Sequence, residues 1–256
     1  MRTLATLVLT AITLIFLLFG YSYWKGQTNL SVKEQTQTNN DVKEPTKETE
    51  ENNDLSLLDH VGKWPEHAVD DYRDALENGI PFKFAIVGSQ VLAGEDGWAE
   101  QLKDEFKNIF NDTIIVEIFQ FDDVNSTDFL ADDVIGQVKD YEPQFMLLEG
   151  FSLNDNGVVP DEQKQENLTE ILDTFSDATV IVQPSHPIFN ANRYATEVDN
   201  QEEFISNAGF VYLNHWSAWP DYTTEEFNTY MGPNQSYPSE KGNEVWFNYL
   251  KEYFFQ

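Results

Sequence analysis

From residue 82 to the C-terminus, short apolar runs alternate with amphipathic stretches of helical length, and this alternation constrains the fold more than any other feature. The runs with strand character cover residues 82–87, 113–121, 145–149, 179–183 and 210–213. The stretches with helical spacing of apolar residues cover 98–110, 126–140, 161–175, 200–207 and 240–254. Strands separated by such helices form parallel sheets with helices on both faces. We therefore predict a three-layer α/β/α domain with a five-stranded parallel sheet, over residues 57–256.

One more helix is predicted ahead of the first strand. Trp64-Pro65-Glu66-His67 opens it, with the proline tolerated in the first turn, and it runs to about Asn78. Gly79 is placed to end it, because glycine accepts the left-handed conformation common after a helix.

The N-terminus predicts a single transmembrane helix over residues 1–25. No charged residue occurs between Thr3 and Trp24, and about 20 apolar residues suffice to span a bilayer as a helix. The alternative is a cleaved secretory signal, whose apolar region is shorter and ends at a small-residue cleavage site. Here the run ends in Gly20-Tyr21-Ser22-Tyr23-Trp24, which supplies interfacial aromatic anchors instead.

Residues 26–56 predict a disordered polar linker, because they contain almost no large apolar side chain. The whole chain has 15 Lys and Arg against 45 Asp and Glu, a net charge of −30. Such acidity argues against nucleic acid or anionic lipid as a partner, so we expect contact with the membrane only through the N-terminal helix. Together with the anchor, it favours a single-pass cell-membrane protein whose domain lies on the extracellular side. The absence of cysteine excludes disulfides and thiolate chemistry.

Ligand sites of open α/β sheets lie beyond the carboxyl ends of the strands, so the loops there carry the candidate residues. The first strand ends in Gly88-Ser89-Gln90, and the third is followed by Asn154-Asp155-Asn156-Gly157. The fourth and fifth strands are followed by His186 and His215. The last helix is preceded by Tyr237-Pro238-Ser239-Glu240-Lys241-Gly242.

These blocks resemble the SGNH (GDSL-type) hydrolase family over about residues 82–256. The family has Gly-Asp-Ser-Leu after its first strand, Gly-x-Asn-Asp after the third and Asp-x-x-His-Pro before the last helix. Gly88, Gly94 and Gly97-Trp98 match the first block, Asn154-Asp155 the third, and Pro238 and Gly242 the last. The resemblance implies an SGNH (flavodoxin-like) fold, an esterase or deacylase activity without a cofactor, and an oxyanion-binding role for Asn154.

The catalytic positions depart from the family pattern. An ungapped match on Gly88 puts Ser89 at the family's Asp and Gln90 at its nucleophilic Ser, whereas a slip of one residue makes Ser89 the nucleophile. Asn234 and Tyr237 take the places of the Asp and the His. A serine hydroxyl needs an adjacent base, and a phenol cannot replace imidazole near pH 7.

Two hypotheses follow. In the first, the chain is an extracellular hydrolase of a small-molecule or glycan ester, with Ser89 activated by His186 or His215 and Asp221 orienting His215. In the second, it is an inactive relative that binds a glycan or a protein partner in a pocket containing Gly88, Gln90, Tyr237 and Asp221. No group of residues has metal-ligand spacing. Aromatic residues of the C-terminal half are core candidates that could also stack on a sugar ring: Trp216, Trp219, Tyr222, Phe227, Tyr230 and Tyr237.

Overall fold

The five predicted strands form one parallel sheet in the computed structural model, which describes residues 55–92 and 94–256. The predicted anchor 1–25 lies outside the described residues, as does the predicted linker 26–56 up to residue 54. Among the described residues, no helix combines the length and the apolar character that crossing a bilayer requires.

The sheet has the strand order β2-β1-β3-β4-β5, so the first strand lies between the second and the third. Every neighbouring pair is parallel. The predicted α/β class and the number of strands are confirmed. The strand bounds are β1 Phe82–Ser89, β2 Ile114–Phe121, β3 Phe145–Glu149, β4 Thr179–Gln183 and β5 Val211–Tyr212.

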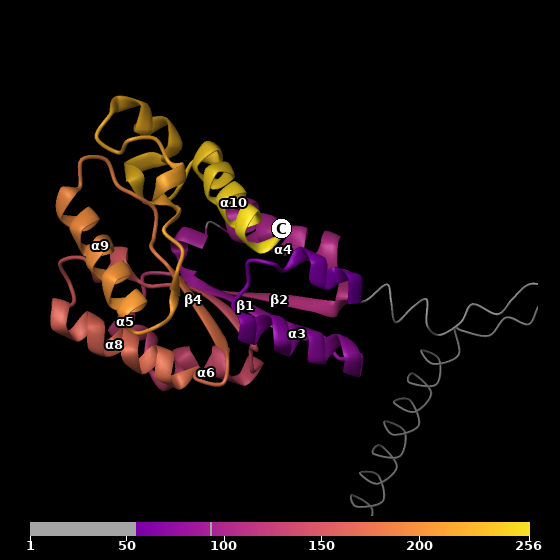
Figure 1. Ribbon diagram of the computed structural model, residues 1–256. Coiled ribbons are helices and arrows are strands. Elements are labelled where there is room, and N and C mark those ends of the chain that lie inside the picture. The colour runs from indigo at the N-terminus through magenta and orange to yellow at the C-terminus, as the bar shows by residue number, and fades with distance from the viewer. Residues whose placement is uncertain (1–54, 93) are drawn as a thin grey trace, which may run out of the picture. The chain divides into compact units, whose positions relative to one another are not determined.

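Alternation of side chains along the buried strands divides the core into two layers. On β1, Phe82, Phe84 and Ile86 belong to one apolar cluster, and Ala85 and Val87 belong to the other. The first cluster is completed by α3 (Glu66–Asn78), α4 (Trp98–Phe110) and α10 (Glu240–Phe254). The second is completed mainly by α6 (Asp132–Tyr141), α8 (Asp161–Thr174) and α9 (Asn192–Asn207). Figure 1 shows α4 and α10 on one side of the sheet and α6 and α8 on the other.

Most predicted helices agree with the structure, and two differ. The stretch predicted as one helix over 126–140 is two, α5 (Ser126–Phe129) and α6, because Ala131 has the extended ψ of 134°. Helix α9 begins at Asn192, eight residues before the predicted start at Asn200. Its first half buries only Tyr194 and Val198, so the apolar spacing there is too sparse to reveal the helix.

Short helical turns connect the main elements, and several of them lie where strands end. They are η1 Ser56–His60, η2 Gln90–Leu92, η3 Gly94–Asp96, η4 Asn111–Thr113, α7 Ser152–Asp155, η5 His215–Ala218, η6 Glu225–Tyr230 and η7 Pro233–Gln235. The predicted end of α3 is confirmed: Gly79 has φ 63° and its N–H donates to the carbonyls of Ala75 and Leu76.

Candidate functional site

A cleft of about 340 Å³ opens beyond the carboxyl ends of β1 and β2, where the topology places a ligand site. Its lining comes from the turns after both strands and from the segment that leads into α10: Gln90, Gly94, Asp96, Gln120, Asp122, Tyr237, Pro238 and Asn243. A groove of about 900 Å³ adjoins this cleft, because it shares Asp96 and Asn243 with it. The groove is acidic, with Glu100, Asp104, Glu240 and Glu244 among its lining residues.

Two glutamine side chains of the cleft are fixed by hydrogen bonds to neighbouring turns. The Oε1 atom of Gln90 accepts from the backbone N–H of Asp123 at 3.1 Å. The Oε1 atom of Gln120 accepts from the N–H of Gly94 at 3.3 Å, and its Nε2 donates to Oδ1 of Asp122 at 2.9 Å. The cleft therefore has an ordered wall of amide groups.

Tyr237 enters the cleft from a small hairpin, in which Met231 and Pro238 pair and the N–H of Gly232 donates to the carbonyl of Tyr237 at 2.8 Å. A Cβ atom at Gly232 would lie 2.5 Å from the tyrosine ring, so only glycine lets the ring pack there. Tyr237 remains 45% exposed. The hairpin thus packs against the Cδ2 and Cε2 atoms of the ring and leaves part of the residue open to a ligand.

Ser89, the predicted nucleophile, is the last residue of β1 and is fully buried. Its backbone N–H donates to Oε2 of Glu149 at 2.9 Å, but its hydroxyl has no hydrogen-bond partner among the described residues. Gly88 beside it is fixed by packing, since a Cβ there would lie 2.8 Å from Cβ of Glu149. Neither Gly88 nor Ser89 lines the cleft.

Glu149 is a polar centre that the sequence interpretation missed. It ends the buried strand β3, is fully buried, and accepts hydrogen bonds from the N–H of Ser89 and the hydroxyl of Ser185. Burial raises the pKa of this carboxyl group, although the bonds from Ser185 and Ser89 oppose that change. An acidic residue directly after four apolar ones was the available signal, and it indicated only a strand end.

His186 lies in the segment after β4 and is fully buried. Its Nε2 is 3.1 Å from the carbonyl oxygen of Gln235, so this nitrogen carries the proton and donates. Its Nδ1 has no partner among the described residues. Burial lowers the pKa of His186 to about 4. No hydrogen bond joins His186 to Ser89, the serine that either His186 or His215 was expected to activate.

His215 is a packing residue whose two ring nitrogens are both bonded. Its Nε2 donates to the carbonyl of Pro184 at 3.0 Å, and its Nδ1 accepts from Nε1 of Trp219 at 2.9 Å. The ring stacks on Trp246 with centroids 4.0 Å apart. Burial lowers the pKa of His215 to about 3. These bonds leave no free lone pair on His215 with which it could activate Ser89.

Asp221, expected to orient His215, instead forms a turn. Its Oδ1 accepts from the N–H and the hydroxyl of Thr223, at 2.9 and 2.7 Å, and these bonds lower the pKa of the exposed carboxyl group. Both nitrogens of His215 have other partners, so the expected pairing with Asp221 is absent.

Asn154, the residue that best matches the family pattern, lies in α7 and is half-buried. Its Nδ2 donates to the carbonyl of Val124 at 2.6 Å and so ties α7 to the segment after β2. Of the C-terminal aromatic residues, Trp219 and Phe227 are buried in the core, whereas Tyr237 faces the cleft. The oxyanion role of Asn154 stays a prediction.

The cleft contains amides, carboxylates and a phenol, and neither a serine nor a histidine is among its lining residues. No group of three or more His, Asp or Glu side chains within the described part of the chain is arranged to hold a metal ion.

Comparison with known proteins shows the fold. No protein-family model matches the chain, and no curated protein has a significantly similar sequence. Among solved structures, the esterase EstA from Pseudoalteromonas sp. is similar, with a TM-score of 0.54 and 17% identity over 66% of this chain and 94% of that one. A putative lipolytic protein of the G-D-S-L family from Desulfitobacterium hafniense gives 0.54 and 15%, over 67% and 98%. The lipase/acylhydrolase from Enterococcus faecalis gives 0.53 and 13%, over 67% and 94%. The resemblance to the SGNH hydrolases is thereby confirmed as a shared fold at low sequence identity.

Proposed function

We propose that this chain, whose domain has the fold of the GDSL-type hydrolases, binds a carbohydrate in the cleft without hydrolysing it. One observation carries the proposal: Gln90 and Tyr237 line the same cleft, and they occupy the positions at which the ungapped resemblance places the nucleophilic serine and the histidine. Their meeting in space supports the ungapped match over the slipped one. The pocket of the family is then retained, while the pair that would perform acyl transfer is replaced.

The cleft offers the contacts that a sugar requires. The amides of Gln90 and Gln120 can donate hydrogen bonds to sugar hydroxyl groups and accept them, and the carboxylate of Asp122 can accept them. The exposed part of the Tyr237 ring provides a flat apolar surface for a sugar face. The adjoining acidic groove of about 900 Å³ extends this surface and disfavours anionic polymers. A neutral or amino-bearing glycan fits best.

Replacing Tyr237 by Ala should weaken glycan binding about tenfold, because an aromatic contact of this kind contributes about 1 kcal/mol or more beyond its buried area. Binding of a panel of neutral and acetylated oligosaccharides would first identify a ligand, and calorimetry would then give its affinity. The Tyr237→Phe variant is the control, since it keeps the ring and should bind nearly as well as the native protein. Equal binding by the Ala variant would place the ligand elsewhere.

A second candidate function is ester hydrolysis by Ser89. The observation in its favour is that the hydroxyl of Ser89 and Nδ1 of His186 are both buried without hydrogen-bond partners among the described residues. Buried polar groups are rarely left unpaired, so both are available to a substrate or to each other after a rearrangement. Covalent labelling by a fluorophosphonate probe that is lost in Ser89→Ala would favour this function.

We also propose that the domain is held at the outer surface of the cell membrane by its N-terminal segment. The uncharged run from Thr3 to Trp24 and the polar composition of residues 26–56 support this location. Protease added to intact cells should release a soluble domain by cutting within residues 26–56. Cleavage that occurs only after lysis would place the domain inside the cell.

A further inference from the structure

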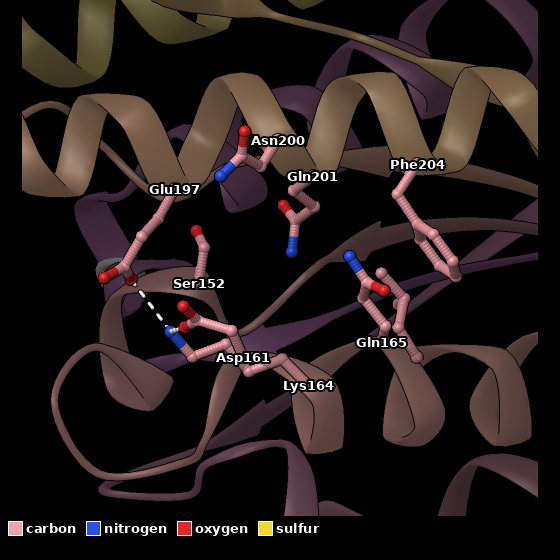
Figure 2. A pocket seen from close by; sticks show the side chains of 9 residues that line it. Ser152, Asp161, Lys164, Gln165, Glu197, Asn200, Gln201 and Phe204 are labelled. Atoms are coloured by element: carbon pink, nitrogen blue, oxygen red, sulfur yellow. Dashed lines mark hydrogen bonds and ion pairs between the residues drawn. The ribbon is translucent and has the colours of Figure 1, made fainter.

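A second pocket lies between α7, α8 and α9 and shares no lining residue with the cleft. Its volume is about 70 Å³. Figure 2 shows its two main walls: α9 contributes Glu197, Asn200, Gln201 and Phe204, and α8 contributes Asp161, Lys164 and Gln165. Ser152 of α7 and Leu168 of α8 complete the lining.

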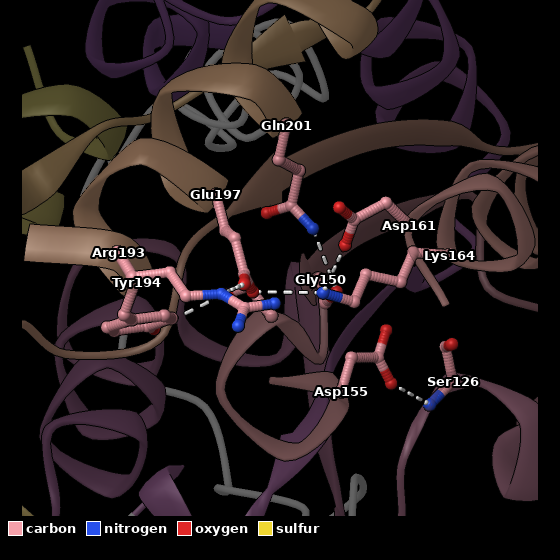
Figure 3. A network of polar contacts seen from close by, with 10 residues as sticks. Ser126, Gly150, Asp155, Asp161, Lys164, Arg193, Tyr194, Glu197 and Gln201 are labelled. Carbon is pink, nitrogen blue, oxygen red and sulfur yellow. Dashed lines mark hydrogen bonds and ion pairs between the residues drawn. The ribbon is translucent and has the colours of Figure 1, made fainter. Parts of the chain in front are cut away.

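One end of this pocket is charged but internally balanced. The Nζ atom of Lys164 lies 2.9 Å from Oε2 of Glu197 and 3.0 Å from Oδ1 of Asp161 (Figure 3). The other carboxylate oxygen of Glu197 lies 3.3 Å from Nε of Arg193. The side chains of Lys164 and Glu197 are only 17% and 12% exposed, so the pair is held in place by its surroundings. With each charge already matched by an opposite one, the pocket offers no unpaired charge to an ionic ligand.

The middle of the pocket is also fixed. The Nε2 atom of Gln201 donates to the carbonyl of Gly150 at 2.9 Å, and its Oε1 accepts from the hydroxyl of Tyr212 at 3.0 Å. The hydroxyl of Ser152 is 3.3 Å from that of Tyr194. These partners set the shape of the pocket without requiring a ligand.

Two carboxamides and two apolar side chains remain. The side chains of Gln165 and Asn200 are exposed and have no hydrogen bond to another described residue. Leu168 is buried, and Phe204 is half-buried beside Gln165, at the end of the pocket away from Glu197 (Figure 2). The pocket therefore combines an apolar end with neutral donors and acceptors at its mouth.

The volume limits the size of the group that can enter. A cavity of about 150 Å³ accommodates benzene, so one of half that size fits a group of about three or four heavy atoms. An acetamido group has that size, and it joins a methyl group to one hydrogen-bond acceptor and one donor. It also carries no charge, as the balanced end of the pocket requires.

We propose that this pocket binds the acetamido group of an N-acetylated sugar, with the methyl group against Leu168 and Phe204 and the amide bonded to the carboxamides of Asn200 and Gln165. The proposal does not rest on glycan binding in the cleft. The pocket would retain an N-acetylated glycan even if the cleft had another role.

Saturation-transfer NMR of the full 256-residue chain tests the proposal, with N-acetylglucosamine as the probe and glucosamine and glucose for comparison. The acetamido methyl protons should receive the strongest saturation, and N-acetylglucosamine should bind about tenfold more tightly than either comparison sugar. Asn200→Ala and Gln165→Ala should each weaken binding about tenfold, as expected for the loss of one hydrogen bond to the ligand.

Asn207→Ala is the matched control, because Asn207 is an exposed asparagine at the end of the same helix and does not line the pocket. This variant should bind N-acetylglucosamine like the native chain. The proposal is overturned if the three sugars bind equally, if none binds at millimolar concentration, or if Asn200→Ala behaves like Asn207→Ala.

Discussion

A variant carrying Gln90→Ser, Asn234→Asp and Tyr237→His should hydrolyse a short-chain p-nitrophenyl ester at least about 100-fold faster than the native chain, whose rate should equal the background. General base catalysis by a positioned imidazole contributes at least this much. Positions 90 and 237 line one cleft, so a hydroxyl and an imidazole placed there share a site. Asn234 has φ 58°, a left-handed conformation that aspartate also tolerates, so Asn234→Asp preserves the turn.

The decisive control for this experiment is Ser89→Ala in the native and the triple-variant backgrounds. If the cleft is the site, removing the buried Ser89 hydroxyl should leave the new activity within about twofold, because Ser89 does not line the cleft. The matched inactive control carries Gln90→Ala together with Asn234→Asp and Tyr237→His. It differs from the triple variant only in lacking the new hydroxyl. If the native chain instead hydrolyses the ester and loses that activity on Ser89→Ala, the binding proposal fails and Ser89 is the nucleophile.

Acidification from pH 7.5 to pH 5 should lower the free energy of unfolding by about 2 kcal/mol through His215. The contribution of His186 should fall by about as much. Burial lowers the pKa of these side chains to about 3 and about 4, below the ordinary value near 6.5 expected in the unfolded chain. Between the lowered and the ordinary pKa, the unfolded chain binds protons that the folded chain does not. The stabilising contribution is therefore complete above about pH 6.5 and is lost as the pH falls toward the folded-state pKa values.

The pH effect is best measured as a difference between proteins. The raised pKa values of Glu149 and Asp155, caused mainly by burial, produce the opposite slope above about pH 4.5, and they are common to native and variant chains. Denaturant unfolding of the native chain and of His215→Gln at the two pH values isolates the histidine. The difference in free energy of unfolding between the native chain and His215→Gln should be about 2 kcal/mol smaller at pH 5 than at pH 7.5. If this difference is the same at both pH values, the ring of His215 is protonated at pH 5 in the folded protein.

Local patterns predicted the layers of this molecule with good accuracy. The run Phe145–Glu149 and the helix Glu240–Phe254 agree with the structure in their bounds, because a short continuous apolar run and an apolar period of 3.6 residues are both local features of the sequence. The pattern failed at α9, where few apolar positions mark the first half, and at Ala131, where a single extended residue divides two helices. The family blocks likewise predicted which loops carry the site, and a cleft lies at two of them, after β1 and before α10.

The partners of the polar side chains could not be predicted from sequence. His186 and His215 follow strands in the same way, yet Nδ1 of His186 has no partner in the described part of the chain, whereas His215 is bonded at both nitrogens. Glu149 accepts a hydrogen bond from the N–H of Ser89, which is 60 residues away in sequence, and Lys164 pairs with Glu197, which is 33 residues away. The spacing of apolar residues and the composition are properties of the sequence itself, and they were enough to predict the sheet and its apolar faces. Only the tertiary structure decided burial and hydrogen bonding at the site, because these depend on how distant segments pack together and exclude water.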